Sequence, residues 1–356
     1  MSNVKDFLKR KDIVITPQRY LIEALGAMAQ GLFASLLIGT IIKTLGQQTG
    51  LDVLVDLGGY ATAMSGPAMA CAIGWAGRTR AGRTSRPLFS LITVGYSANA
   101  LGGAGGPLAV LIIAIVASEL GKAVSKETRV DILVTPLVTI FSGVGLSMLI
   151  AAPIGAAASQ VGTLIMWATE QAPLVMGILV SVIVGVALTL PISSAAICAA
   201  LGLTGLAGGA AVAGCCAQMI GFAVMSYKEN GVGGLVSQGL GTSMLQMGNI
   251  VKNPRIWIAP TLASAITGPL ATCVFHFEMN GAAVSSGMGT CGLVGQIGVY
   301  TGWVSDIAAG TKAAITPMDW AAMVLLCFVL PAVLSVIFCE IERKLGWIKE
   351  GDLKLN

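Results

Sequence analysis

The stretch Pro254–Gly281, PRIWIAPTLASAITGPLATCVFHFEMNG, begins as an apolar helix and ends among polar residues. Asn253 and Pro254 are typical of a helix start, as N-cap and first helical residue. Gly268-Pro269 predicts an interruption of that helix. His276, the only histidine of the chain, follows two residues before Glu278. Ionisable groups between apolar runs are costly in a bilayer unless they face protein, water or a ligand.

The rest of the chain is equally apolar. Its 356 residues are 55% hydrophobic and 11% charged, with a mean hydropathy of +0.84. A soluble domain carries about 25% charged residues. The composition therefore predicts an all-α polytopic membrane protein, and we expect about ten membrane-inserted elements, including broken helices and re-entrant hairpins.

The apolar runs place these elements along the chain. They are Tyr20–Leu45, Leu51–Gly77, an interrupted 87–118, Ile132–Ala152, Val161–Leu190, 191–227, the stretch from Pro254, 281–302 and Met318–Glu340. The glycines and the proline in Asn99–Pro107, NALGGAGGP, predict a broken helix or a re-entrant pair. Glu170, Gln171 and Pro173 predict that the run Val161–Leu190 is kinked or split.

Positive charge suggests the orientation. The loop Arg78–Arg86, RTRAGRTSR, carries four arginines, and such loops remain in the cytoplasm. Both chain ends are basic as well, so we expect both in the cytoplasm. Residues 1–18 are expected to form an amphipathic segment on the inner membrane surface, or else a frayed tail. Residues 19–345 are then the membrane domain and 346–356 a cytoplasmic C-terminal tail.

A possible internal repeat connects two of the apolar runs. An offset of 78 residues superposes Pro191 on Pro269 and Gln218 on Gln296, with several glycines between them. Chance is the alternative, because glycine and alanine are abundant here. Irregular elements at corresponding positions of two repeats indicate a transporter site. In that case two hairpin-like elements face each other, and His276 and Glu278 belong to the second.

The candidate site is built from carboxylate, amide and hydroxyl groups. Asn280-Gly281 is a turn signal, which favours an unwound segment in which His276 and Glu278 face one cavity. Such groups suit a hydroxyl-rich ligand. The candidate binding residues are His276, Glu278, Asn280, Asn99, Gln218, Gln296, Ser193, Ser194 and Thr290. The alternatives are a surface loop without a ligand and, for single amides or hydroxyls, contacts between helices.

Other chemistry has little support in the sequence. The eight cysteines lie mostly in apolar runs without zinc-site spacing and are expected to pack between helices. One histidine excludes a histidine-rich metal site, and GGAGGP lacks the Lys-Ser/Thr of a P-loop. We expect no metal, no cofactor, no nucleic-acid partner and no catalytic motif. The expected partners are a small polar solute and the lipid bilayer.

Several long motifs resemble a known family. These are GYSANALGGAGGPLAVL (95–111), LPISSAAICAALGLTGLAGGAAVAGCCAQMIGFAV (190–224), NPRIWIAPTLASAITGPLATCVF (253–275) and GMGTCGLVGQIG (287–298). They resemble the phosphotransferase-system enzyme IIC-like membrane proteins of the perfringolysin O regulator type, over nearly the whole chain. The resemblance implies a bacterial cell-membrane protein, a homodimer, and a sugar site in which a glutamate and a histidine contact the sugar. Glu278 and His276 are the matching positions, although the family's Ile-Thr-Glu-Pro loop is absent.

The resemblance leaves two functions open. The chain holds neither a phosphohistidine domain nor a soluble phosphotransfer domain, so any phosphotransfer requires separate partner proteins. The favoured function is a membrane transporter component for a small polar solute, a sugar or sugar derivative. The alternative is a membrane-bound solute sensor that regulates gene expression.

Overall fold

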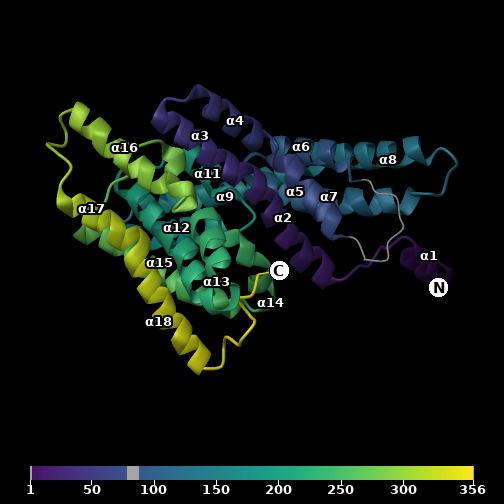
Figure 1. The fold of residues 1–356 in the computed structure, drawn as a ribbon. Coiled ribbons are helices and arrows are strands. Elements are labelled where there is room, and N and C mark those ends of the chain that lie inside the picture. The colour runs from purple at the N-terminus through teal and green to yellow at the C-terminus, as the bar shows by residue number, and fades with distance from the viewer. Residues whose placement is uncertain (1, 78–87, 356) are drawn as a thin grey trace. The chain divides into compact units, whose positions relative to one another are not determined.

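The computed structural model describes residues 2–77 and 88–355, and its regular elements there are helices. Within those ranges, Gly205 and Met279 form an isolated antiparallel bridge. The chain divides into two compact units, residues 1–157 and 158–356. Figure 1 shows the helices of each. The predicted all-α fold is confirmed, whereas the Arg78–Arg86 loop lies outside the described residues.

The first unit begins with α1 (Ser2–Arg10), and the position of residues 1–18 on the inner membrane surface stays a prediction. Ion pairs fix the last residue of α1 and the residue after it to the unit. Arg10 contacts Glu127 at 2.9 Å and the buried Lys11 contacts it at 2.5 Å. The hydrogen bond from Lys11 holds the pKa of the Glu127 carboxyl below its usual value. Helix α1 is thus followed by a docked segment.

The next helical stretch, Gln18–Thr49, confirms the first predicted span. It contains η1 (Gln18–Glu23), α2 (Ala24–Leu32), η2 (Phe33–Leu37) and α3 (Ile38–Thr49). The second predicted span is instead two helices, α4 (Asp52–Ala63) and α5 (Ser65–Ala76), which pack on α3 and α2 respectively. Pro67 has no N–H to donate to the carbonyl of Ala63, so the helix starts anew there.

The glycine-rich stretch breaks a helix, as predicted. Helix α6 (Leu91–Gly102) ends at Gly103, whose φ of +51° a side chain would disfavour. After η3 (Gly103–Gly105), α7 (Gly106–Val124) packs beside α6. Helix α8 (Asp131–Leu146), η4 (Ser147–Ala151) and α9 (Ala152–Thr169) form one helical stretch.

The second unit is organised around a buried helix. The run Val161–Leu190 is split before Pro173, and α10 (Pro173–Thr189) follows the break. Helix α12 (Gly205–Met225) packs against α10, α15 (Ile258–Pro269) and α18 (Leu330–Lys344). All residues from Gly208 to Met219 are buried. Helix α12 is therefore the central element of this unit.

The predicted interruption at Gly268-Pro269 is wrong. Pro269 is inside a helical stretch that continues through η8 (Leu270–Val274), a π-helical turn. Such wider turns accommodate a residue that cannot donate a backbone hydrogen bond. Gly268 has a packing role instead, because a Cβ there would lie 2.1 Å from the carbonyl oxygen of Gly177 on α10.

The offset of 78 residues is not reproduced. Pro191 follows the end of α10, whereas Pro269 is inside a helix. The two irregular segments nevertheless face each other: α11 (Ser194–Leu201) packs on η9 (Ala283–Gly287), and Ser194 Oγ donates to the Gly287 carbonyl at 2.7 Å. Helices α11 and η9 therefore face each other, but the two proline positions do not correspond as the offset of 78 residues requires.

The remaining elements connect these helices. They are α13 (Tyr227–Val236), η5 (Ser237–Gly241), η6 (Ser243–Gln246), α14 (Met247–Lys252), η7 (Pro254–Trp257), η10 (Cys291–Leu293), α16 (Val294–Ala308), α17 (Pro317–Val324) and η11 (Leu325–Val329). The predicted helix start is confirmed, since Asn253 Oδ1 accepts from the Arg255 N–H at 3.3 Å and Pro254 is the first helical residue.

Six helical stretches of described residues are long and apolar enough to cross a membrane. They are Gln18–Thr49, Leu91–Val124, Asp131–Thr169, Gly205–Met225, Pro254–Val274 and Pro317–Lys344, and α10 is a shorter apolar helix. Large apolar side chains such as Ile132 (85% exposed) and Phe141 (74% exposed) point outward from α8. The chain is thus a multi-pass membrane protein, while the total of about ten inserted elements stays a prediction.

Candidate functional site

The chain leaves the helix after Val274: Phe275 still has helical dihedral angles (φ −96°, ψ −11°), the backbone turns at His276, and an extended segment, residues 277–280, follows. His276 and Glu278 are exposed, whereas Phe277 and Met279 are buried (3% and 0% exposed). From Phe277 to Met279 this alternation has the period of a strand. His276 precedes that part, and its imidazole is exposed like the Glu278 carboxylate. His276 has a φ of +44°, an uncommon conformation for a residue other than glycine.

Backbone contacts fix this extended segment against α12. Gly205 and Met279 exchange hydrogen bonds of 2.9 and 3.0 Å, and the Phe277 N–H donates to the Ala271 carbonyl at 2.8 Å. A Cβ at Gly209 would lie 1.6 Å from the Phe277 carbonyl oxygen, so only glycine permits this approach. Phe277 and Met279 belong to a buried cluster that includes Val212, Cys216, Val299, Trp303, Met323 and Leu326.

A cleft of about 500 Å³ opens over the exposed side of this segment. Its lining comes from the extended segment, the end of α16, the α16–α17 loop and the start of α17. The lining residues are Phe275, His276, Phe277, Glu278, Asn280, Trp303, Asp306, Thr311, Lys312, Thr316, Met318, Asp319 and Ala322. Three of the predicted site residues, His276, Glu278 and Asn280, are thus in one cleft.

Two carboxylates of the cleft share one amide. The side-chain nitrogen of Asn280 donates to Glu278 Oε2 at 3.1 Å and to Asp306 Oδ2 at 2.8 Å. The amide of Asn280 therefore holds both carboxylates in fixed positions, with their other oxygens available to a ligand. Gly302 permits this arrangement, because a Cβ there would lie 2.8 Å from the Asn280 backbone nitrogen.

An ion pair forms another wall of the cleft. Lys312 Nζ contacts Asp319 Oδ1 at 2.8 Å and lies 5.8 Å from the centre of the Trp303 ring. Asp319 also caps α17 in a reciprocal box with Thr316, whose N–H and hydroxyl donate to it at 2.7 and 2.9 Å. The cap orients Asp319, and the aromatic ring and Asp319 position the ammonium group.

Three aromatic rings pack together next to the cleft: Trp303 is a buried part of the lining, and Tyr300 and Trp320 are outside it. Trp303 packs edge-on to Trp320 with ring centres 5.6 Å apart, and Tyr300 lies 5.9 Å from Trp320. The site therefore combines apolar faces with a few oriented polar groups, which is the usual composition of a small-molecule site.

Asp306, Lys312 and Asp319 were not among the predicted site residues. The sequence contained one signal for them: Thr316–Asp319 is a Ser/Thr-x-x-Asp/Glu capping pattern before an apolar run. That pattern predicts a helix start after a polar loop. It does not reveal that the loop folds back over residues 275–280, since that depends on the packing of α16 and α17.

Gln218 and Gln296 are buried in helix contacts rather than in the cleft. Gln218 Oε1 accepts from Trp257 Nε1 at 2.9 Å, and its nitrogen lies within 3.4 Å of the Thr261 and Ser264 hydroxyls. The nitrogen of Gln296 contacts Cys216 Sγ at 3.2 Å.

The predicted hydroxyl residues also make local contacts. Ser193 caps α11 by accepting from the Ala196 N–H at 3.2 Å, and Ser194 contacts Gly287 as described above. Thr290 donates to the Gly239 carbonyl. Of these bonds, the one from Ser194 joins the facing elements α11 and η9, the one to Ser193 stays within α11, and the one from Thr290 reaches η5. All three are structural contacts, which is the alternative for such groups.

Asn99 belongs to the first unit. Its side-chain nitrogen lies 3.4 Å from the Ser65 hydroxyl, and a Cβ at Gly106 would lie 2.6 Å from its side-chain oxygen. Asn99 therefore braces the turn between α6 and α7.

Metal chemistry finds no support in the part of the chain that the structure describes. No group of three or more His, Cys, Asp or Glu side chains there could hold a metal ion. The cleft can instead bind by hydrogen bonds and aromatic contact.

Comparison with known proteins gives one match. The sequence profile of the family "Phosphotransferase system, EIIC" matches residues 22–355. No curated protein matches the chain. No solved structure matches it either.

Proposed function

We infer the function from one premise, that the chain belongs to the phosphotransferase system EIIC family, and we propose that its cleft binds a sugar or sugar derivative for transport. The family match supports a membrane transporter component of the phosphotransferase system. Six helical stretches that could span a membrane agree with that role. The substrate class and the binding residues are our proposal.

The cleft supports the proposal by its chemistry. A sugar presents adjacent hydroxyls at its edge and apolar C–H groups on its faces. Glu278 and Asp306 supply acceptors that can each take hydrogen bonds from neighbouring hydroxyls. His276 and Lys312 can contact other oxygens, and the partly buried Phe275 ring can contact an apolar face. The single observation that carries the proposal is the joint placement of His276 and Glu278, two residues apart, in the lining of one cleft.

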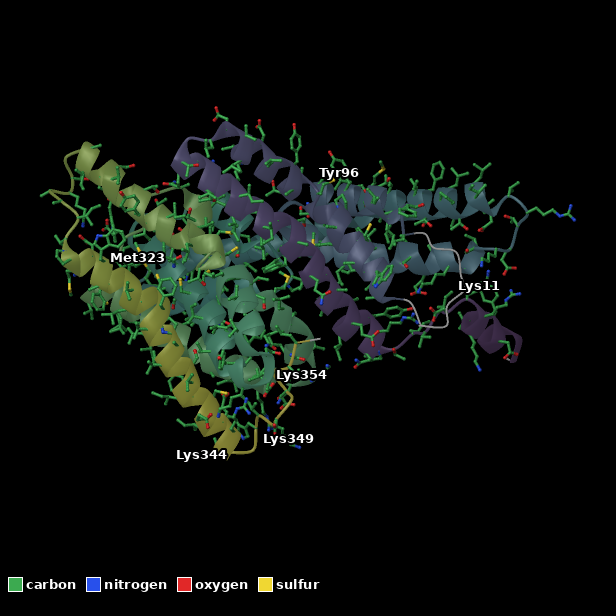
Figure 2. The ribbon with its side chains drawn as sticks, in the orientation of Figure 1. Lys11, Tyr96, Met323, Lys344, Lys349 and Lys354 are labelled. Atoms are coloured by element: carbon green, nitrogen blue, oxygen red, sulfur yellow. The ribbon has the colours of Figure 1, made fainter. Side chains whose placement is uncertain are left out.

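The charge distribution indicates the side of the membrane to which the cleft opens. The helical stretch Pro317–Lys344 is 28 residues long, so it extends about 42 Å at 1.5 Å per residue. The cleft is at its start, and Arg343 and Lys344 are at its end. Figure 2 shows Lys344, Lys349 and Lys354 at the end of α18 away from Met323. Because basic ends stay in the cytoplasm, we propose that the cleft opens to the exterior.

A ligand screen tests the binding proposal. The purified protein is mixed with a panel of sugars, polyols and organic anions, and thermal unfolding is monitored. A bound ligand raises the unfolding midpoint by mass action. Sugars are expected to stabilise the protein, and stabilisation by organic anions alone would exclude a sugar site. Uptake of the stabilising sugar into proteoliposomes then separates transport from sensing, since a sensor binds without uptake.

Glu278→Gln tests the residue assignment with the sugar found in the screen. A hydrogen bond to a charged group contributes about 1.5–3 kcal/mol, so affinity should fall roughly tenfold to hundredfold. His276→Ala should have a smaller effect if the ring only lines the cleft. Glu170→Gln is the matched control, because Glu170 is exposed between α9 and α10. Unchanged affinity in titration calorimetry of folded Glu278→Gln protein would restore the surface-loop alternative.

A further inference from the structure

The C-terminal segment, residues 346–355, folds back on the second unit in turns: the Asp352 N–H donates to the Lys349 carbonyl and the Lys354 N–H to the Gly351 carbonyl, each at 3.2 Å. The segment begins after α18 and lies along α13 and α14 (Figure 2). Two side chains of the segment, Ile348 and Leu353, are buried (3% and 0% exposed), whereas Lys349, Glu350 and Lys354 are exposed. Leu353 is therefore an apolar anchor inside an otherwise solvent-facing segment.

Side chains from α13, α14 and the residues between them bind the backbone of this segment. Glu229 Oε2 accepts from the Leu353 N–H at 2.8 Å. The Leu353 carbonyl accepts from Asn230 at 2.8 Å and from Gln246 at 2.9 Å. The Leu355 N–H donates to Asn230 Oδ1 at 2.8 Å. One asparagine amide thus spans two backbone groups, as a neighbouring strand would.

Two further amides extend this recognition. Asn249 donates to the Lys354 carbonyl at 2.9 Å, and Asn253 donates to the Trp347 carbonyl at 2.9 Å. Asn253 also contacts Asp352 Oδ2 at 2.9 Å. We call Glu229, Asn230, Gln246, Asn249 and Asn253 the amide cradle. Because most of these bonds reach backbone groups, the cradle recognises the main chain of this turned segment more than particular side chains.

The amide cradle is held in shape by bonds that do not involve the C-terminal segment. The nitrogen of Gln246 donates to Gln238 Oε1 at 2.9 Å, and the nitrogen of Asn249 donates to Gln246 Oε1 at 2.7 Å. Gln238 in turn donates to the Ser226 hydroxyl at 2.8 Å. Both Gln238 and Gln246 are fully buried. Without the segment, these bonds would persist and the donors and acceptors that face it would lack partners.

We propose that the amide cradle is a peptide-binding site for a polypeptide turn with one leucine-like anchor, occupied in cis by residues 346–355. The segment leaves by local opening, and an identical peptide can replace it in trans. The buried amides of Gln246 and Asn249 favour rebinding, because unsatisfied polar groups in a buried site are costly. This inference does not depend on the sugar proposal, so either can fail alone.

Hydrogen exchange on the unmodified protein tests the opening step. Amides in residues 346–355 should exchange at least a hundredfold faster than those of the buried helix α12, because local opening needs less free energy than global unfolding. Exchange of the C-terminal segment at the rate of α12 would show a permanent structural element and overturn the proposal. This measurement requires no variant.

Peptide binding tests the exchange step in the full chain. Leu353→Asp should expel the segment, because a carboxylate in the anchor position would be buried without a partner. A fluorescein-labelled peptide with the sequence of residues 346–356 should then bind this variant at least tenfold more tightly than the unmodified protein, by fluorescence anisotropy. No binding to a folded Leu353→Asp protein, or equal binding to both proteins, would contradict the proposal.

Two controls make the peptide result specific. The labelled peptide with aspartate in place of Leu353 should bind neither protein. Adding Asn230→Ala to Leu353→Asp should abolish binding, since Asn230 contacts both Leu353 and Leu355. If the peptide still binds the double variant, it binds elsewhere, and the amide cradle is rejected as its site. If Leu353→Asp fails to fold, the hydrogen-exchange measurement decides.

Discussion

At the scale of single residues, Asn280 connects the predicted part of the site to the part that the sequence did not indicate. It donates to Glu278, its neighbour two residues away, and to Asp306, which is 26 residues away. One side-chain amide thus joins the extended segment to the end of α16. The arrangement suggests that Asp306 has a role equal to that of Glu278.

Asp306→Asn separates the charge of this residue from its structural contact. The amide oxygen can still accept from Asn280, so the unfolding midpoint should change little. Loss of the charged acceptor should weaken binding of the sugar found in the screen by roughly tenfold. Calorimetric titration measures the affinity, with Glu170→Gln again as control. An affinity equal to that of the unmodified protein would restrict the site to the extended segment.

Gly209→Ala should disturb the site from α12, the helix against which the segment packs. The new Cβ would be placed 1.6 Å from the Phe277 carbonyl oxygen, so the backbone between His276 and Glu278 must move. We expect at least a tenfold loss of sugar affinity, since small displacements of binding groups are costly. Gly233→Ala is the control, because a Cβ there meets no atom within 4 Å. Equal affinities in the two variants would show that the segment position is unimportant for binding.

At the scale of elements, the packing of helices decides where each one ends. The glycine-proline pair at 268–269 has the sequence of a helix break, yet the helix continues to Val274. Helix α10 packs along this stretch, and the π-helical turn accommodates the proline. The true end, five residues later, lets the chain turn at His276 and leave the helix toward Asn280.

Gly268→Ala should therefore act on stability through helix packing. A Cβ 2.1 Å from the Gly177 carbonyl oxygen would push α10 and α15 apart, and overpacking of this kind costs about 1–3 kcal/mol. We expect the thermal unfolding midpoint in detergent to fall by several degrees. Gly162→Ala should leave it equal or higher, because its Cβ would be 3.4 Å from a flexible Leu201 methyl and alanine favours helix. A lower midpoint only for Gly162→Ala would contradict this account.

At the scale of the whole molecule, the proposed orientation separates the cleft from the amide cradle. Within the second unit, the helical stretch Pro317–Lys344 places Lys312 and Thr311 near its first end and the C-terminal segment near its last. A sugar site open to the exterior would thus lie across the membrane from a peptide site open to the cytoplasm. The homodimer stays a prediction.

Labelling of intact cells tests this orientation. Thr311→Cys should react with a membrane-impermeant maleimide added outside, and Lys349→Cys should not, because only the first residue is expected to face the exterior. Gly82→Cys in the arginine loop should also fail to react. The background carries Cys71→Ser and Cys273→Ser, since the other native cysteines are buried. Outside labelling of Lys349→Cys with protection of Thr311→Cys would reverse the orientation.

The sequence alone determined the fold class, the helix start at Asn253-Pro254, the break after Gly102 and the polar end of the run from Pro254. These features depend on local chemistry: hydropathy, capping and the backbone limits of glycine and proline. Only the tertiary structure decided that Pro269 stays helical, that Gln218 and Gln296 are buried in helix contacts, and that Asp306 and Lys312 join Glu278. Those outcomes depend on which helices approach each other, and residues far apart in the chain determine that approach.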